Sequence, residues 1–342
     1  MSTRRAARVA DIAQVAGVGT ATVDRVLHAR GGVSPATIQR VREAELAVSS
    51  GASSPKGSKA DQQLFFHAIL PADAGRATEV LGRLLTQMCG NRVANMEVSF
   101  VEKMNPAALA ARLDAATTNG ASGIAFQALD HPLVHSAVER VAAAGIPMTA
   151  LLSNLMDSTL PYVGVDNRAA GRTAGFLMGR LVQNRSRVAV VWSGDLYRSH
   201  EEREFGFRSI LRSDHPHLEV VDLVGGADDS ERNYHQLRDA LDMHPDLRGI
   251  YSVGGGNGGL VRALNEANRS ADITVIPHNL TVETQRWLLD GTIDALVSQD
   301  LELAARRAIE ALLAQCHGEP TELRLLPIEV VTRENARGHV ID

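Results

Sequence analysis

Short apolar runs alternate with helical patterns from residue 64 onward, and this alternation constrains the fold more than any other feature of the sequence. The apolar runs predict strands at 64–70, 96–101, 123–127, 147–152, 188–192, 218–224, 249–253, 273–276 and 295–298. Helical patterns lie between them, at 107–119, 133–144, 169–182, 202–211, 233–242 and 282–289. Short apolar strands joined by helical crossovers indicate parallel sheets in an α/β fold. Because these strands are many for one open sheet, we expect two similar lobes.

Polar side chains follow most of these predicted strands. In parallel α/β sheets, ligands bind at the carboxyl ends of the strands. Each polar residue there could instead be a helix N-cap, a role that Asp, Asn and Ser favour. If the loops converge, their carboxylates and amides suit a polyhydroxylated ligand, because each hydroxyl group both donates and accepts a hydrogen bond. The candidate residues are Asp73, Gln127, Asp130, Asn154, Asp166, Asn257, His278, Asn279 and Gln299.

The first fifty residues follow another pattern, that of a helix, a tight turn and a second short helix. Ala13 is small enough for two helices to meet closely, Gly17 suits a turn with positive φ, and Val23 lies one turn into the second helix. Ser34 and Pro35 predict the start of a third helix that ends near residue 48. This spacing is typical of an all-α helix-turn-helix domain.

The charge distribution separates this head from the rest of the chain. Residues 1–59 contain seven Arg and two Lys against two Asp and two Glu, a net charge of +5. The whole chain has a net charge of -5, so the remainder carries -10. A basic head on an acidic body indicates that the head alone meets phosphate groups.

A segment rich in Ser, Gly and Pro separates the two parts. Residues 49–59 can neither bury a core nor hold a helix in isolation, which predicts a flexible linker. We therefore expect a helix-turn-helix domain at 1–48, a linker at 49–62 and a two-lobed α/β domain at 63–342. At 342 residues, of which 44% are hydrophobic, the chain can support several cores.

Several classes of protein fit the sequence poorly. No run approaches the roughly 20 apolar residues that a membrane span requires, and the Arg-rich start lacks a secretory apolar region, so we expect a cytoplasmic protein without a membrane partner. Cys89 and Cys316 stand far apart and without neighbouring metal ligands, which argues against a disulfide framework or a metal site. No Ser lies in a nucleophile elbow, and we expect no catalytic residues.

The head resembles the DNA-binding domain of the LacI/GalR family of bacterial transcriptional repressors. The residues that carry this resemblance are Ala13, Ala16-Gly17-Val18, Thr22-Val23, Arg25-Val26-Leu27 and Val33-Ser34. The body is similar to the family's effector domain, which has the fold of periplasmic sugar-binding proteins of the ribose-binding type. Its matching segments are Gly123-Ile-Ala-Phe-Gln127, Ala144-Gly-Ile-Pro147, Gly164-Val-Asp-Asn167 and the run from Gly171 to Gly175.

The resemblance implies a role for particular residues of the head. The recognition helix, at about 20–28, would enter the major groove of operator DNA, where Thr20, Ala21 and Arg25 would read bases. Arg25 is the candidate for a bidentate contact with guanine. The remaining predicted contacts, with phosphate, are Thr22, Arg4, Arg5 and Arg8.

For the body, the resemblance implies a small polar effector, a sugar or polyol with or without a phosphate group, and adds Arg203 as an effector contact. An ion pair of Arg203 with Glu202 or Glu204 is the alternative. The sequence departs from the family where Asp73-Ala-Gly-Arg76 replaces a turn usually lined by aromatics, and where no hinge helix is visible in 49–59. The resulting hypothesis is a homodimeric repressor that binds operator DNA under effector control, without a cofactor.

Two other classes remain open. The run Gly254-Gly-Gly-Asn-Gly-Gly259 satisfies the G-x-G-x-x-G pattern of dinucleotide-binding folds, which would make the chain an NAD-dependent oxidoreductase. Its late position in the chain, and Asp272 coming early for a ribose contact, argue against that class. A freestanding sugar-binding protein is the other alternative.

Overall fold

The computed structural model describes residues 9, 12–13, 16–28, 30–49, 63–192, 194, 196–224, 226, 228–321 and 325–339. The chain divides into two compact units, Met1–Gln62 and Gln63–Asp342. Of the predicted features, Arg4, Arg5, Arg8 and linker residues 50–62 lie outside the described residues.

The first unit is a small helical domain. Helices α2 (Thr20–Leu27) and α3 (Pro35–Ser49) follow the helical residues Val9, Ile12, Ala13 and Ala16. Buried Ile12, Ala13, Ala16, Val23, Val41 and Ala44 form its core. Gly17 has φ 62°, as the turn between the helices requires. The Ser34 hydroxyl accepts a hydrogen bond from the Thr37 N–H at 3.3 Å, which supports the predicted start of α3.

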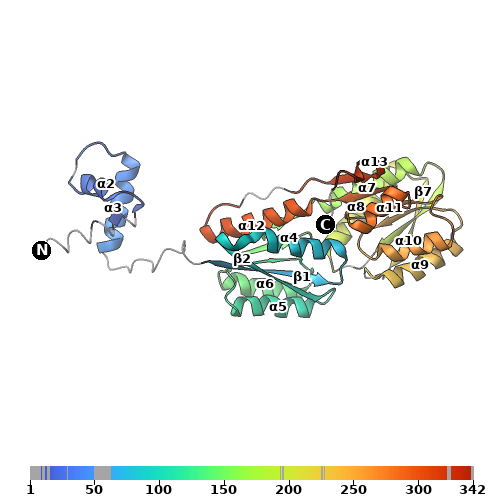
Figure 1. The fold of residues 1–342 in the computed structure, drawn as a ribbon, viewed down its shortest axis with the longest axis horizontal. Coiled ribbons are helices and arrows are strands. Elements are labelled where there is room, and N and C mark those ends of the chain that lie inside the picture. Colours follow the sequence, from blue (N-terminus) through green and yellow to red (C-terminus); the bar gives the residue numbers. More distant parts are fainter. Residues whose placement is uncertain are drawn as a thin grey trace. The chain divides into compact units, whose positions relative to one another are not determined.

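The second unit has two lobes, of which the first contains a five-stranded parallel sheet in the order β2-β1-β3-β4-β5. Its helices cover both faces of the sheet, with α4 and α12 on one side and α5 and α6 on the other (Figure 1). Leu81 and Leu312 belong to the core on the first face, and Leu113 and Val134 to the core on the second. The strands of this lobe are β1 (Leu64–Ala72), β2 (Ala94–Glu102), β3 (Gly123–Phe126), β4 (Met148–Leu151) and β5 (Tyr162–Val163). Its helices are α4 (Arg76–Val93), α5 (Pro106–Thr118), α6 (Pro132–Ala143) and α12 (Leu301–His317).

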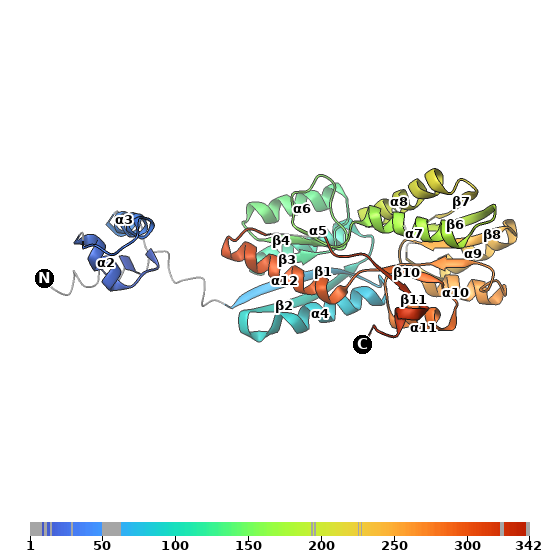
Figure 2. The same ribbon diagram turned by 90° about the horizontal axis from the view of Figure 1, so that it is seen from above.

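The second lobe contains a four-stranded parallel sheet in the order β7-β6-β8-β9 and an antiparallel pair, β10-β11. Helices α7 and α8 pack together, as do α9 and α10 (Figure 2). Its strands are β6 (Ser186–Trp192), β7 (Leu218–Val224), β8 (Leu247–Ser252), β9 (Thr274–Ile276), β10 (Ala295–Ser298) and β11 (Glu329–Thr332). Its helices are α7 (Asn167–Leu181), α8 (Arg198–Asp214), α9 (Ser230–Met243), α10 (Asn257–Glu266), α11 (Val282–Asp290) and α13 (Arg333–Ala336).

The chain crosses between the lobes at three connections: from β5 to α7, from β10 to α12, and from α12 back to β11. The prediction of an α/β fold with parallel sheets is confirmed, and each of the nine predicted strands overlaps an observed one. Two strands were not predicted: β5, which is only two residues long, and β11, which pairs antiparallel with β10.

Candidate functional site

A small cavity lies between the two lobes, at the carboxyl ends of their strands. Its volume is about 60 Å³, below the roughly 300–1,000 Å³ of typical ligand pockets. The lobes must therefore part to admit a ligand larger than a few water molecules. The residues that line the cavity are Ala74, Ala77, Thr78, Gln127, Leu152, Tyr197, Ser199, His200, Arg203, Asp228, Gly254, Gly255, Asn279 and Gln299.

The guanidinium group of Arg203 lies in the wall of this cavity and is held rigidly. Its Nε donates to Asn167 Oδ1 at 2.8 Å and its Nη1 to the carbonyl of Val253 at 3.0 Å. Arg203 is only 4% exposed, and burial lowers its pKa, yet an arginine stays charged. Among the described residues, no carboxylate lies within 4.0 Å of it. The alternative of an ion pair with Glu202 or Glu204 is wrong, because these residues pair with Arg198 and Arg208.

Close packing of two helices fixes the position of Arg203. A Cβ atom added to Gly171 of α7 would lie 1.9 Å from the Arg203 carbonyl oxygen, and one added to Gly206 of α8 would lie 2.2 Å from the Arg168 carbonyl. The two helices therefore meet backbone against backbone, which requires glycine on both sides. This contact places the start of α8 against the cavity.

Three buried polar atoms at the cavity have no hydrogen-bond partner among the described residues. They are Oε1 of Gln127, Nδ1 of His200 and Oε1 of Gln299. A buried polar atom without a partner costs about 1–3 kcal/mol, so such atoms usually mark a place where a ligand or water completes the structure. Desolvation by burial lowers the pKa of His200 to about 4, so this imidazole is neutral near pH 7.

Contacts between the lobes close the cavity in this conformation. The Lys103 ammonium group, in the turn after β2, donates to the carbonyl of Asp73 at 2.9 Å and to that of Asp228, in the other lobe, at 3.4 Å. The Asp130 N–H donates to the Leu196 carbonyl at 2.8 Å. The Ser199 N–H donates to the Ser153 hydroxyl at 3.4 Å.

Four of the predicted effector residues line this cavity: Gln127, Arg203, Asn279 and Gln299. Asn257 and His278 line an adjoining hollow of about 370 Å³, which Asn279 shares. His278 is buried there and its Nε2 lies 2.8 Å from the Tyr251 hydroxyl.

The other predicted effector residues lie elsewhere. Asn154 and Asp166 line a separate hollow, and Asp166 is the N-cap of α7, accepting from the Ala169 N–H at 2.9 Å. Asp73 is exposed in the turn after β1, with φ 51°. Asp130 is 2.7 Å from His135 Nε2, which occupies its carboxylate. Local capping and pairing therefore account for Asp130 and Asp166 without a ligand.

Sequence reasoning missed several lining residues, above all His200, Ser199 and Asp228. His200 and Ser199 are on the first turn of α8, in the same segment as Arg203. The signal available in the sequence was that Arg203 lies one helical turn after His200, so both fall on one face of α8.

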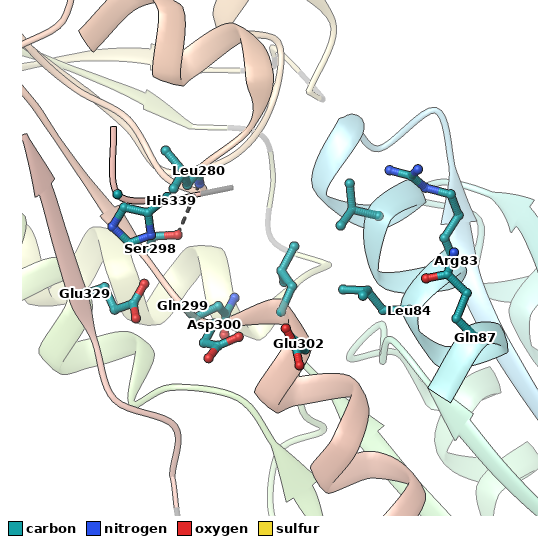
Figure 3. Close-up of a pocket in the computed structure, with 13 residues that line it drawn as sticks. Arg83, Leu84, Gln87, Leu280, Ser298, Gln299, Asp300, Glu302, Glu329 and His339 are labelled. Atoms are coloured by element: carbon teal, nitrogen blue, oxygen red, sulfur yellow. Dashed lines mark hydrogen bonds between the residues drawn. The ribbon is translucent and has the colours of Figure 1, made fainter. Parts of the chain in front are cut away.

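A larger pocket of about 530 Å³ lies beside the β10–α12 crossing (Figure 3). Arg83, Leu84 and Gln87 of α4 line one side of it, and Gln299 belongs to both this pocket and the interlobe cavity. The Leu280 N–H donates to the Ser298 hydroxyl at 3.1 Å on the opposite side. This pocket therefore adjoins the connection about which the lobes would move.

In the first unit, the predicted base-reading residues Thr20, Ala21 and Arg25 are exposed on α2, and Thr22 is half-buried. The N-cap residue Gly19 has no side chain to satisfy the first N–H groups of the helix. This helix start is therefore free to meet a phosphate. Asp24, on the same helix, pairs with Arg30 at 3.2 Å and with His28 at 3.4 Å.

The fold and the site define a two-lobed binding protein joined to a helix-turn-helix head. The chain belongs to the family described as periplasmic binding protein domain, whose profile matches residues 88–320, and its head matches bacterial regulatory proteins, lacI family, over residues 8–46. The resemblance noted in the sequence is thereby confirmed. Neither family is one of enzymes.

Individual relatives are sugar-binding proteins. The D-ribose/D-allose-binding protein of Pseudomonas aeruginosa is 24% identical over 182 residues, which cover 51% of this chain and 56% of that protein. A solute-binding protein of Burkholderia graminis, solved with D-arabinose, superposes with a TM-score of 0.76 at 22% identity, covering 82% of this chain and 99% of its own. A solute-binding protein of Agrobacterium vitis, solved with α-D-tagatopyranose, superposes with a TM-score of 0.74 at 19% identity. The match covers 80% of this chain and 96% of that protein.

The described part of the chain contains no helix long and apolar enough to cross a membrane. It also contains no group of three or more His, Cys, Asp or Glu side chains arranged to hold a metal ion.

Proposed function

We propose that this protein is a transcriptional repressor whose binding to operator DNA is controlled by a small polyhydroxylated effector in the interlobe cavity. The observation that carries the proposal is the set of three unpartnered polar atoms, on Gln127, His200 and Gln299, in a chain that also has a helix-turn-helix head. An isolated binding protein would not need that head.

The head supports the DNA-binding half of the proposal. The exposed face of α2 presents Thr20, Ala21 and Arg25, and the start of this helix has no side-chain cap. A single three-helix head buries little DNA surface, and twofold operators match twofold dimers, so we propose a homodimer acting in the cytoplasm.

The relatives support a sugar or polyol as the effector. Their names and bound ligands are pentoses and hexoses: D-ribose, D-allose, D-arabinose and tagatopyranose. The unpartnered oxygens of Gln127 and Gln299 are acceptors that sugar hydroxyl groups would satisfy.

The glycine run 254–259 has a role in packing that does not require a dinucleotide. Gly256 is the N-cap of α10 with φ 72°, and a Cβ on Gly259 would lie 1.7 Å from the Ser230 carbonyl oxygen. These constraints explain Gly256 and Gly259 by helix geometry and packing, which weakens the oxidoreductase alternative.

The test is to select duplex DNA from a random pool with the full-length protein and to titrate sugars and polyols into the complex. We expect one sequence to bind at least about 10³ times more tightly than random DNA. One sugar or polyol should then change its affinity by about 5–150-fold. A protein that enriches no sequence would contradict the proposal, and binding of NADH would favour the oxidoreductase.

A further inference from the structure

Three helices begin at the interlobe cavity, and none of them has a side-chain cap. They are α4, α8 and α10, with N-cap residues Gly75, Tyr197 and Gly256. Residues of their first turns or of the loops that precede them line the cavity. The other long helices of this unit differ, because the first-turn N–H groups of α5, α6, α7, α9, α11 and α12 bond to side chains of Asn105, His131, Asp166, Asp229, Thr281 and Asp300.

This difference matters because a helix start carries a positive partial charge and unsatisfied N–H donors. The starts of α4, α8 and α10 thus lie around one small space, and of their first-turn N–H groups that of Ser199 in α8 already donates to the Ser153 hydroxyl at 3.4 Å. The long helices that begin at the cavity lack a side-chain cap, whereas the other long helices of the unit have one.

Among the described lining residues the formal charges of Arg203 and Asp228 balance, so the positive partial charges of the three helix starts decide the sign. Arg203 is buried with no carboxylate of the described residues within 4.0 Å, and the Lys103 ammonium group donates to the carbonyl oxygens of Asp73 and Asp228. Asp228 is the one carboxylate among the described lining residues, and its Oδ1 accepts from the Gly255 N–H at 2.5 Å. A buried guanidinium group with no carboxylate in contact is stabilised when a ligand supplies an anionic group.

Two other polar atoms at the cavity indicate a second kind of ligand group. Gln299 is 5% exposed, and its Oε1 has no partner among the described residues; the same is true of Gln127 Oε1. These oxygens accept hydrogen bonds, which an anionic group cannot donate. A ligand that satisfies both sets of groups carries hydroxyls as well as an anion.

We propose that the effector is an acidic sugar, in which a phosphate or carboxylate group lies against the starts of α4, α8 and α10 and beside Arg203. Its hydroxyl groups donate to Gln127 and Gln299. This inference rests on the proposed function, since it names the chemical class of the effector bound at the same site. Charge-assisted hydrogen bonds to the anion are shorter and stronger than those to a neutral hydroxyl.

The test compares matched ligands by calorimetry with the full-length protein. D-Ribose, D-ribonate and D-ribose 5-phosphate form one set, and D-glucose, D-gluconate and D-glucose 6-phosphate another. We expect an acidic member to bind at least tenfold more tightly than its neutral parent, with ribonate or gluconate indicating a carboxylate and the phosphates indicating a phosphoryl group. Inorganic phosphate should raise the melting temperature above that in sodium chloride of equal ionic strength. Equal or tighter binding of the neutral parents, or no effect of any anion, overturns the proposal.

A pair of variants separates local charge from net charge. Ala74→Asp adds a carboxylate at the cavity, just before α4, where an acidic group also favours the helix start. Ala271→Asp adds the same charge at an exposed position before β9, at the opposite end of the strands. We expect A74D to weaken phosphate or acidic-sugar binding at least tenfold and A271D to leave it unchanged. Equal effects of the two variants would overturn the proposal.

The outcomes also distinguish this inference from the proposed function. If a neutral sugar alters operator binding and no acid binds, the inference fails and the regulator stands. If an acidic sugar binds but operator affinity does not change, the ligand class stands and the effector-controlled regulator fails.

Discussion

At the scale of single residues, two arginines in this chain differ in what surrounds them. Arg25 is exposed on α2, and its guanidinium group is free to approach a base edge. Arg203 is buried at the cavity, with Nε and Nη1 already fixed by Asn167 and Val253. The first is available for sequence readout, whereas the second is preorganised for a small ligand.

Replacing Arg25 by Ala is expected to remove discrimination at one base pair of the selected operator. A bidentate contact with guanine is worth about 1–3 kcal/mol of discrimination. Competition binding with single-base variants of the operator measures this discrimination. Arg40→Ala, which removes an exposed arginine from α3, is the matched control. If R25A weakens binding to all sequences equally, Arg25 contacts phosphate instead.

The buried His200 makes stability depend on pH. Its pKa is about 4 in the folded protein against 6.5 ordinarily, so the unfolded chain takes up a proton that the folded chain does not. The free energy of unfolding should therefore fall as pH drops from 6.5 to 4, by about 3 kcal/mol in full at 1.36 kcal/mol per pKa unit.

Denaturant unfolding between pH 7 and 5 checks this expectation. His200→Gln should flatten the pH dependence, whereas His235→Gln, at an exposed histidine of α9, should leave it as it is. Identical slopes for H200Q and the parent protein would show that His200 is not held neutral. His278 and His67, whose pKa values are also lowered by burial, would account for the slope that remains in H200Q.

At the scale of elements, glycines set how closely the helices approach. Gly171 and Gly206 bring α7 and α8 into backbone contact, and Gly259 does the same for α10 against α9. A Cβ at these positions would have to displace a backbone carbonyl rather than a movable side chain. Packing of this kind tolerates no added methyl group.

Adjacent positions on α10 allow a direct test. Gly259→Ala should lower the free energy of unfolding by about 1–3 kcal/mol, the usual cost of overpacking. A Cβ added at Gly258 would meet only the Ser230 hydroxyl, at 3.2 Å. Gly258→Ala should therefore change the free energy of unfolding little, because alanine is also the better helix former. Equal losses in the two variants, measured by urea unfolding, would contradict the role given to Gly259.

The sequence predicted the strands well and the site only in part. Strands buried on both faces appear as apolar runs, so their positions could be predicted before the structure. The two-residue β5 gives no such signal. Helix α4 contains Gly82 and a non-helical Gly90, which obscured its helical pattern.

The site residues were harder to predict because Asp, Asn and His have several structural and functional roles. Asp166 caps a helix and Asp130 pairs with a histidine, and neither role can be told from ligand binding by residue type. His200 and Asp228 meet at the cavity only through the packing of separate loops. Which polar residues converge is a property of tertiary structure.

At the scale of the whole second unit, Lys103 links the two lobes. Its ammonium group bonds to carbonyl oxygens of Asp73 and Asp228, on either side of the cavity. The hydrogen bonds from the Asp130 and Ser199 N–H groups to the opposite lobe depend on the same closure.

Lys103→Ala should let the lobes open more often. A hydrogen bond from a charged group contributes about 1.5–3 kcal/mol, so hydrogen exchange of the Asp130 and Ser199 amides should accelerate about tenfold or more. Arg140→Ala, which removes an ion pair with Asp114 inside one lobe, is the control and should not affect them. Unchanged exchange in K103A would show that Lys103 does not hold the closed form.

Because the cavity between the closed lobes measures only about 60 Å³, the closed form has no room for a sugar. A sugar would bind only to molecules whose lobes have parted, so the apparent dissociation constant would rise with the population of the closed form. The strength of the Lys103 link would in this way set the ligand concentration at which the protein begins to respond.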